Sequence, residues 1–96
     1  MAADMTIEGA VRTVTILNAK GLHARASAKF VKCAAAFDAN VQVTKDGQTV
    51  GGTSIMGLMM LGAAPGSVVE LSATGSDSAD VLNALEALIK SRFGED

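Results

Sequence analysis

The residues best equipped for chemistry lie together in the segment Gly21-Leu22-His23-Ala24-Arg25. His23 is the single histidine of the chain, and a neutral imidazole is a nucleophile through its unprotonated ring nitrogen. Arg25 adds a permanent positive charge on a planar group that fits phosphate oxygens. This combination indicates chemistry on a phosphoryl or similar anionic group. A lone histidine also occurs as an ordinary surface residue or helix cap, and the residue types alone leave that alternative open.

A helix that begins at the histidine places both residues at a site suited to anions. The alanine-rich composition from His23 to about Phe37 favours helix. The first turn of a helix leaves backbone N–H groups without partners, so the amides of Ala24 and Arg25 can hold an anion. The same field disfavours imidazolium, so we expect a largely neutral ring at neutral pH. Gly21 permits a backbone conformation that helps to expose the ring. The predicted buried side of this helix comprises Ser27, Phe30, Val31, Ala34 and Phe37.

The strands that support this helix are predicted from alternation and turn residues. Alternating polar and apolar residues predict a strand over about 13–17, followed by a loop over 18–22. A second alternating segment covers 41–44. Asp46-Gly47 is a strong hairpin signal, so the chain is expected to return as a third strand over 48–51.

The second half of the chain predicts a short helix, a strand and a long helix. Ser54 is a good N-cap for a helix over residues 55–61, and residues 68–73 have high β propensity. A last helix is expected to start near residues 76–78 and to end at Gly94. Its apolar side comprises Val81, Leu82, Leu85, Leu88, Ile89 and Phe93.

The resulting order is β-α-β-β-α-β-α. Two helical crossovers and one hairpin predict an α+β fold, an open-faced β-sandwich in which a four-stranded antiparallel sheet carries three helices on one face. The chain of 96 residues is long enough for one domain. We expect residues 1–10 to form a flexible leader and residues 11–96 to form the domain.

Composition argues against several classes of function. The formal charge of −2 and the presence of only three aromatic residues argue against a nucleic-acid partner. The longest apolar run, residues 55–64, is too short for membrane insertion, since a span needs about 20 residues. Cys33 has no second cysteine to pair with, which agrees with a cytoplasmic protein, and one histidine and one cysteine do not make a metal site. We therefore expect a cytoplasmic monomer without metal or other cofactor.

A second candidate surface follows Ser54. Ile55, Met56, Met59 and Met60 are too many apolar residues for a short helix to bury on one face, so we expect some to face solvent and to form a docking surface for partner proteins. Leu22 is expected to extend this surface.

The segment around His23 resembles the active-site signature of the HPr family, the histidine-containing phosphocarriers of the bacterial phosphoenolpyruvate-dependent phosphotransferase system. Ser54-Ile55-Met56-Gly57-Leu58-Met59 is similar to the second-helix segment of that family, at the expected distance from His23. The resemblance implies that His23 is phosphorylated on Nδ1 and that Arg25 is the active-site arginine. It also implies enzyme I as the phosphoryl donor and an A-type domain of the same system as the recipient, so that the chain is a carrier and not an enzyme.

The resemblance also assigns a regulatory role to Ser54. In some bacteria an ATP-dependent HPr kinase/phosphorylase acts on the matching serine, and the added charge weakens transfer from enzyme I. A phosphoserine is tolerated at a helix N-terminus but alters the charge beside a docking surface. We therefore expect regulation without unfolding.

The chain departs from the family at Ala26, where a proline usually follows the arginine. Alanine keeps the backbone N–H that proline lacks. Our hypothesis is that the Ala26 amide donates an extra hydrogen bond to the His23 ring or to the phosphoryl group, beside the amides of Ala24 and Arg25.

Three alternatives to this interpretation stay open. The nitrogen-regulatory branch uses an HPr-like carrier with an equivalent histidine and a different A-type recipient. An acylphosphatase-like hydrolase has a similar layered fold, but the Gly-rich loop and the asparagine expected of it do not accompany Arg25. A ligand-binding regulatory domain would give His23 no chemistry.

Overall fold

A computed structural model of the protein describes residues 9–95. It confirms the predicted order of strands and helices. The elements are β1 (Gly9–Thr15), α1 (Ala24–Ala35), β2 (Asn40–Lys45), β3 (Gln48–Gly51), α2 (Ile55–Met60), β4 (Val68–Thr74) and α3 (Ser78–Lys90), followed by a 3-10 turn, η2 (Arg92–Gly94).

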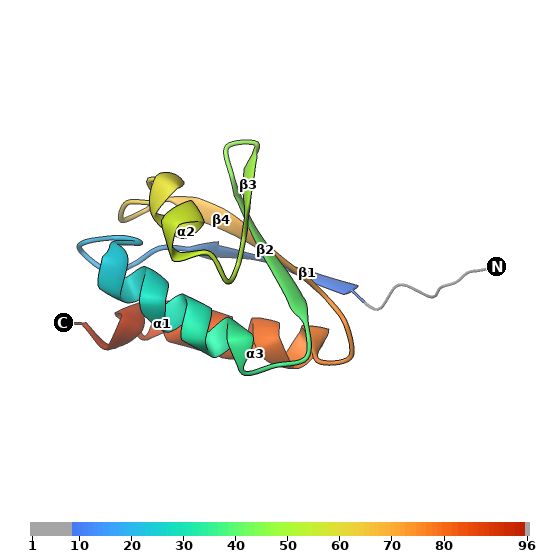
Figure 1. Ribbon diagram of the computed structural model, residues 1–96. Helices are drawn as coiled ribbons and strands as arrows, with labels where there is room; N and C mark the ends of the chain where they lie inside the picture. Colours follow the sequence, from blue (N-terminus) through green and yellow to red (C-terminus); the bar gives the residue numbers. More distant parts are fainter. Residues whose placement is uncertain (1–8, 96) are drawn as a thin grey trace.

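The four strands form one antiparallel sheet in the order β1-β4-β2-β3. Alternate residues of β4 and its neighbours are buried, so one face of the sheet meets the helices, as predicted. The helices α1 and α3 lie side by side along the molecule, and α2 lies at the end where α1 begins (Figure 1). That end therefore brings together the starts of two helices. The core between sheet and helices includes Ile16, Phe30, Val43, Leu58, Leu71, Leu82, Leu85 and Ile89.

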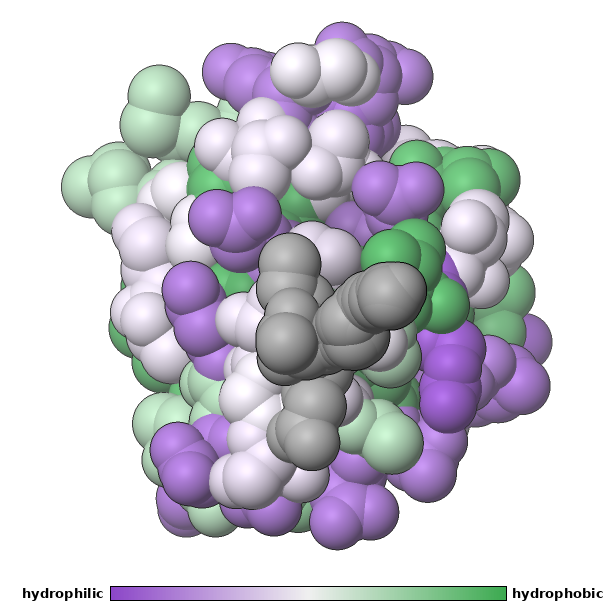
Figure 2. Space-filling model, turned by 90° about the vertical axis from the view of Figure 1, so that its right-hand side faces the viewer, coloured by the Kyte–Doolittle hydropathy of each residue, from purple (hydrophilic) through white to green (hydrophobic). Residues whose placement is uncertain are grey.

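The opposite end, where β1 begins, has a mixed surface. Figure 2 shows small, separate hydrophobic areas there, between hydrophilic and neutral residues. The exposed large hydrophobic side chains of α2 belong to the other end of the molecule (Figure 1).

Two predicted boundaries are wrong. The domain begins before residue 11, because Gly9 and Ala10 pair with Thr74 and Ala73 of β4 and extend the first strand. The rest of the predicted leader, residues 1–8, lies outside the described residues.

The last helix ends at Lys90 rather than at Gly94. The chain then turns through Arg92, Phe93 and Gly94 with φ values of 59°, 56° and 73°, all in the left-handed region. Phe93 still reaches the core, with 1% of its surface exposed, but it does so from this turn. The turn redirects the chain toward the start of α1 (Figure 1).

Candidate functional site

His23 is the N-cap of α1, so the helix begins where the sequence predicts. Its backbone is extended, and its carbonyl accepts the hydrogen bond of Ser27 N at 2.8 Å. The ring Nδ1 accepts a hydrogen bond from the amide of Arg25 at 3.3 Å. This contact places Nδ1 beside the first-turn amides, where a helix attracts anions.

The loop before His23 is packed closely against the segment that follows α2. Gly21 has a φ of +63°, which confirms that its backbone needs the freedom of glycine. A side chain is also excluded, because a Cβ at this position would lie 2.2 Å from the carbonyl oxygen of Ala63. The next residue, Leu22, donates its backbone N–H to the same oxygen at 2.9 Å. The close approach at Gly21 and the hydrogen bond of Leu22 thus fix the backbone just before His23.

The other ring nitrogen of His23 has a partner that the sequence did not predict. Nε2 lies 2.5 Å from Oε2 of Glu95, in the segment after η2. Asn18 Nδ2 donates to the second carboxylate oxygen of Glu95 at 3.1 Å and to the carbonyl of Gly21 at 2.8 Å. These hydrogen bonds, first that of His23 and then that of Asn18, lower the pKa of the Glu95 carboxyl below its usual value. A carboxylate therefore faces the ring.

The two contacts of the ring assign its tautomer. Nδ1 accepts from an amide, and an ionised carboxylate can only accept, so the hydrogen of the neutral ring is assigned to Nε2. Nδ1 then carries the lone pair. The site presents a nucleophilic nitrogen at the positive end of a helix.

Arg25 lies in the first turn of α1 and is exposed. Its guanidinium forms no ion pair with the residues from 9 to 95. It can therefore approach an anion brought to His23. The structure thus confirms the prediction that His23 and Arg25 lie together at the start of one helix.

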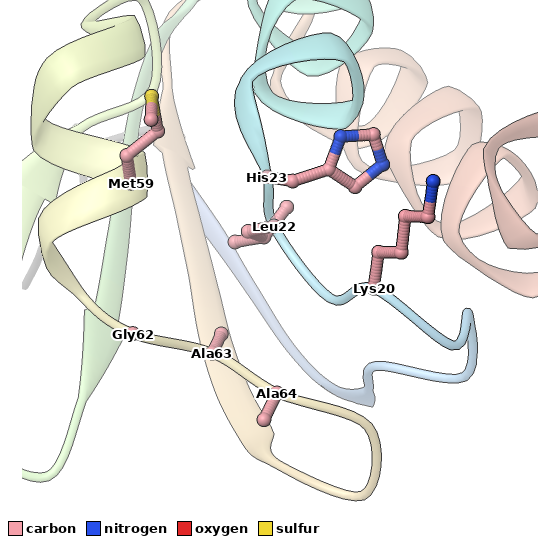
Figure 3. A pocket seen from close by; sticks show the side chains of 7 residues that line it. All are labelled: Lys20, Leu22, His23, Met59, Gly62, Ala63 and Ala64. Carbon is pink, nitrogen blue, oxygen red and sulfur yellow. The ribbon is translucent and has the colours of Figure 1, made fainter.

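An open pocket connects His23 to α2. His23 and Lys20 lie on one side of it, and Met59 lies across from them on α2 (Figure 3). Leu22, Gly62, Ala63 and Ala64 complete its lining. The docking surface predicted on α2 thus adjoins the histidine directly.

The residues predicted for docking divide into two groups. The exposed fractions are 41% for Ile55, 69% for Met56 and 43% for Met59, with Met60 at 68%. Leu22 is only 5% exposed, because its side chain packs into the core, so the prediction that it extends the surface is wrong. We call Ile55, Met56, Met59 and Met60 the α2 patch.

Ser54 caps α2 as predicted. Its Oγ accepts a hydrogen bond from the amide of Gly57 at 3.0 Å, and the residue is exposed. The hydroxyl is therefore accessible to a modifying enzyme, while its structural role is a local one.

The hypothesis on Ala26 is only partly tested. The amide that bonds the ring is that of Arg25, so the proposed bond from Ala26 to the ring is wrong. The reason is geometric, because the N-cap side chain reaches the second amide of the helix. A contact between the Ala26 amide and a phosphoryl group stays a prediction. The Ala26 side chain itself is fully buried.

Other kinds of site find little support in residues 9–95. That range contains no helix long and apolar enough to cross a membrane and no group of three potential metal ligands among His, Cys, Asp and Glu. Burial raises the pKa of the Cys33 thiol, which makes it a weak nucleophile.

Known proteins are similar to this chain in sequence and in fold. A family model described as the PTS HPr component phosphorylation site matches residues 10–91. The phosphocarrier protein HPr of Neisseria meningitidis is 51% identical over 84 residues, covering 88% of this chain and 94% of that protein. A crystal structure of HPr from Thermoanaerobacter tengcongensis is 46% identical, covers 91% of this chain and 98% of its own, and has a TM-score of 0.87. A second structure from that organism, of an HPr dimer, has a TM-score of 0.73 at 42% identity and covers 98% of this chain and all of its own.

Proposed function

This chain belongs to the HPr family of phosphocarriers of the phosphotransferase system, and from that premise we propose that His23 is the residue that carries the phosphoryl group. It accepts the group on Nδ1 from phosphorylated enzyme I and passes it to a histidine of an A-type domain. The observation that carries the proposal is the 3.3 Å contact between Arg25 N and Nδ1 of His23, which holds Nδ1 beside the first-turn amides of α1.

The surroundings of Nδ1 suit a transient phosphoryl group. The amides of Ala24, Arg25 and Ala26 can donate to its oxygens, and the exposed Arg25 guanidinium can offset their charge. These contacts stabilise the group without adding a covalent bond, so it remains available for transfer. The chain itself acts as a substrate of other proteins rather than as an enzyme.

Labelling tests this proposal. The protein is incubated with labelled phosphoenolpyruvate and enzyme I, and we expect an acid-labile, base-stable label that His23→Ala abolishes. Cys33→Ser is the control and should keep the label. An unlabelled protein, or a label that survives in the His23→Ala variant, would contradict the proposal. Offering the labelled protein to A-type domains of the sugar and nitrogen branches then identifies the recipient.

The role of Ala26 is tested on the same label. We propose that its amide donates to the phosphoryl group and stabilises it, so Ala26→Pro should shorten the lifetime of the phosphohistidine. Ala28→Ser, two residues further along α1 at an exposed position, is the control. An unchanged lifetime in Ala26→Pro rejects this contact.

Ser54 supplies the regulation in this proposal. Phosphorylation by an HPr kinase/phosphorylase would add about two negative charges at the start of α2, beside the surface on which enzyme I docks. Treatment with the kinase and ATP should label the wild type and leave Ser54→Ala unlabelled, and the Ser54-phosphorylated protein should accept phosphate from enzyme I more slowly. An equal rate before and after modification would remove the regulatory role.

The α2 patch supplies the docking surface. Met56 is the most exposed of its four residues, so a charge there disturbs the contact with partners rather than the core. Met56→Asp should raise the KM of enzyme I for this protein and leave the Tm nearly unchanged. Val11→Asp, at an exposed apolar residue on β1, is the matched control and should leave KM unchanged.

We also propose that the carrier works as a cytoplasmic monomer. A relative from Thermoanaerobacter tengcongensis has been solved as a dimer, so the state of this chain is a separate question. Sedimentation at micromolar concentrations should give the mass of one chain, and a mass twice as large would reject the proposal.

A further inference from the structure

The turn after α3 is built in a way that fixes the position of Glu95. Arg92 and Phe93 both adopt left-handed backbone conformations, which residues with a side chain rarely take up without support. The support comes from the buried Phe93 side chain and from Lys29 of α1, whose Nζ donates to the Phe93 carbonyl at 2.6 Å. The chain is therefore tied to α1 two residues before Glu95.

Both carboxylate oxygens of Glu95 are engaged. Oε2 faces Nε2 of His23, and Oε1 accepts from Asn18. Asn18 is 1% exposed and uses the same amide nitrogen to hold the Gly21 carbonyl, in the loop that carries His23. One buried side chain thus aligns the carboxylate with the loop of the histidine.

We propose that Glu95, oriented by Asn18, is a positioning residue that holds the hydrogen of His23 on Nε2 and so aims the Nδ1 lone pair at the incoming phosphoryl group. The inference rests on the proposed function of His23, and it assigns a task to a residue 72 positions away in the sequence. A hydrogen bond at one imidazole nitrogen decides which nitrogen is free to react.

The transfer step balances with the hydrogen held in place. The Nδ1 lone pair forms the new N–P bond, and the electron pair of the breaking N–P bond returns to the donor histidine. Nε2 keeps its hydrogen, so the phosphorylated ring carries a positive charge that faces the Glu95 carboxylate. On transfer to the acceptor the same ring leaves as neutral imidazole, and no proton has to move on this side.

The charges around the carboxylate agree with this task. His23 and Asn18 donate to Glu95, and Lys20 adds a favourable charge at longer range. All three effects lower the pKa of Glu95, so it is ionised at neutral pH and available as an acceptor. Arg25, whose guanidinium forms no ion pair within residues 9–95, is left to serve the phosphoryl group.

The test combines a measurement on the unphosphorylated protein with a transfer assay. In the wild type, a long-range 1H–15N spectrum should show hydrogen on Nε2 with slowed solvent exchange. Glu95→Ala should speed that exchange and lower the single-turnover rate constant for transfer from enzyme I, each on the order of tenfold, with KM unchanged. Glu95→Gln keeps an oxygen that can accept the hydrogen bond, so it should restore part of the slowed solvent exchange and part of the transfer rate constant.

The matched control is Glu86→Ala, which removes a carboxylate that bonds Arg12 and Lys90 instead of the histidine. It should change neither quantity. If Glu95→Ala shows the same solvent exchange and the same transfer rate constant as the wild type, the inference is overturned. A raised KM with an unchanged rate constant would also overturn it, because Glu95 would then be a docking residue. If the wild type takes no label, the proposed function fails, while the spectrum still decides whether Glu95 fixes the ring.

Discussion

The two helices that meet at the functional end of the molecule begin in similar ways but are held differently. At α1, Nδ1 of His23 accepts an amide hydrogen from Arg25, and at α2, Oγ of Ser54 accepts one from Gly57. The histidine ring has a second partner, Glu95, from the far end of the chain. The side-chain hydrogen bond of Ser54 joins it to Gly57, only three positions away.

The difference matches the tasks proposed for the two side chains. A ring that attacks phosphorus must be aimed, and aiming requires contacts from several directions. A serine that an enzyme modifies must instead be accessible, and a local cap leaves it so. Contacts from distant parts of the chain therefore distinguish the reactive helix start from the modifiable one.

The largest effect is expected from removing the buried side chain that anchors the turn before Glu95. Phe93→Ala deletes a ring that is 1% exposed and should lower the free energy of unfolding by about 3 kcal/mol or more. Denaturant titration measures this cost, and amide exchange should show lost protection near His23 with little change at Gly57. Phe37→Ala, at a half-buried ring, should cost less. Equal loss of protection at both helix starts would contradict the comparison.

A smaller effect is expected from the loop before His23. Gly21→Ala places a Cβ against the Ala63 carbonyl in a left-handed conformation and should cost at least about 2 kcal/mol of unfolding free energy. Gly62→Ala has nearly the same φ but open space around the new methyl group, so its cost should be about 1 kcal/mol. Transfer to His23 should fall only in the first variant. Similar costs would show that the close approach at Gly21 is unimportant.

The local parts of both helix starts could be predicted from the sequence, and the distant contacts could not. Residue types and spacing predicted a helix that begins at His23 and Ser54 as the cap of the next helix, because helix starts depend on neighbours in the chain. Glu95 was missed because nothing in its local sequence points to a histidine 72 residues away. Phe93 was assigned to the helix because it follows Ile89 by four residues, although the chain leaves the helix at Lys90. Leu22 was placed on the surface because its burial depends on the packing of segments distant in sequence.

The cap of α2 should behave as a local feature. Ser54→Ala removes the acceptor of the Gly57 amide and should lower the free energy of unfolding by about 1 kcal/mol. Phosphorylation of His23 by enzyme I should keep its wild-type rate constant, because no contact of the ring is lost. Thr53→Ala, at the exposed neighbour, is the control for the substitution itself. A slowed transfer would show that the two helix starts are coupled.

The smallest effect, a pH dependence, separates the two starts most cleanly. The pKa of Glu95 is lowered below its ordinary value of 4.5, chiefly by the hydrogen bond of His23, so its contribution to stability is present above that value and is lost as the pH falls through the folded pKa. The Tm difference between wild type and Glu95→Gln should therefore be present at about pH 5 and shrink as the pH falls below 4.5. The difference between wild type and Ser54→Ala should stay level over the same range, because neither a serine hydroxyl nor an amide titrates there. A pH-independent Glu95→Gln difference would mean that the carboxylate charge does not stabilise the start of α1, and the two helix starts would then differ only in how many contacts hold them.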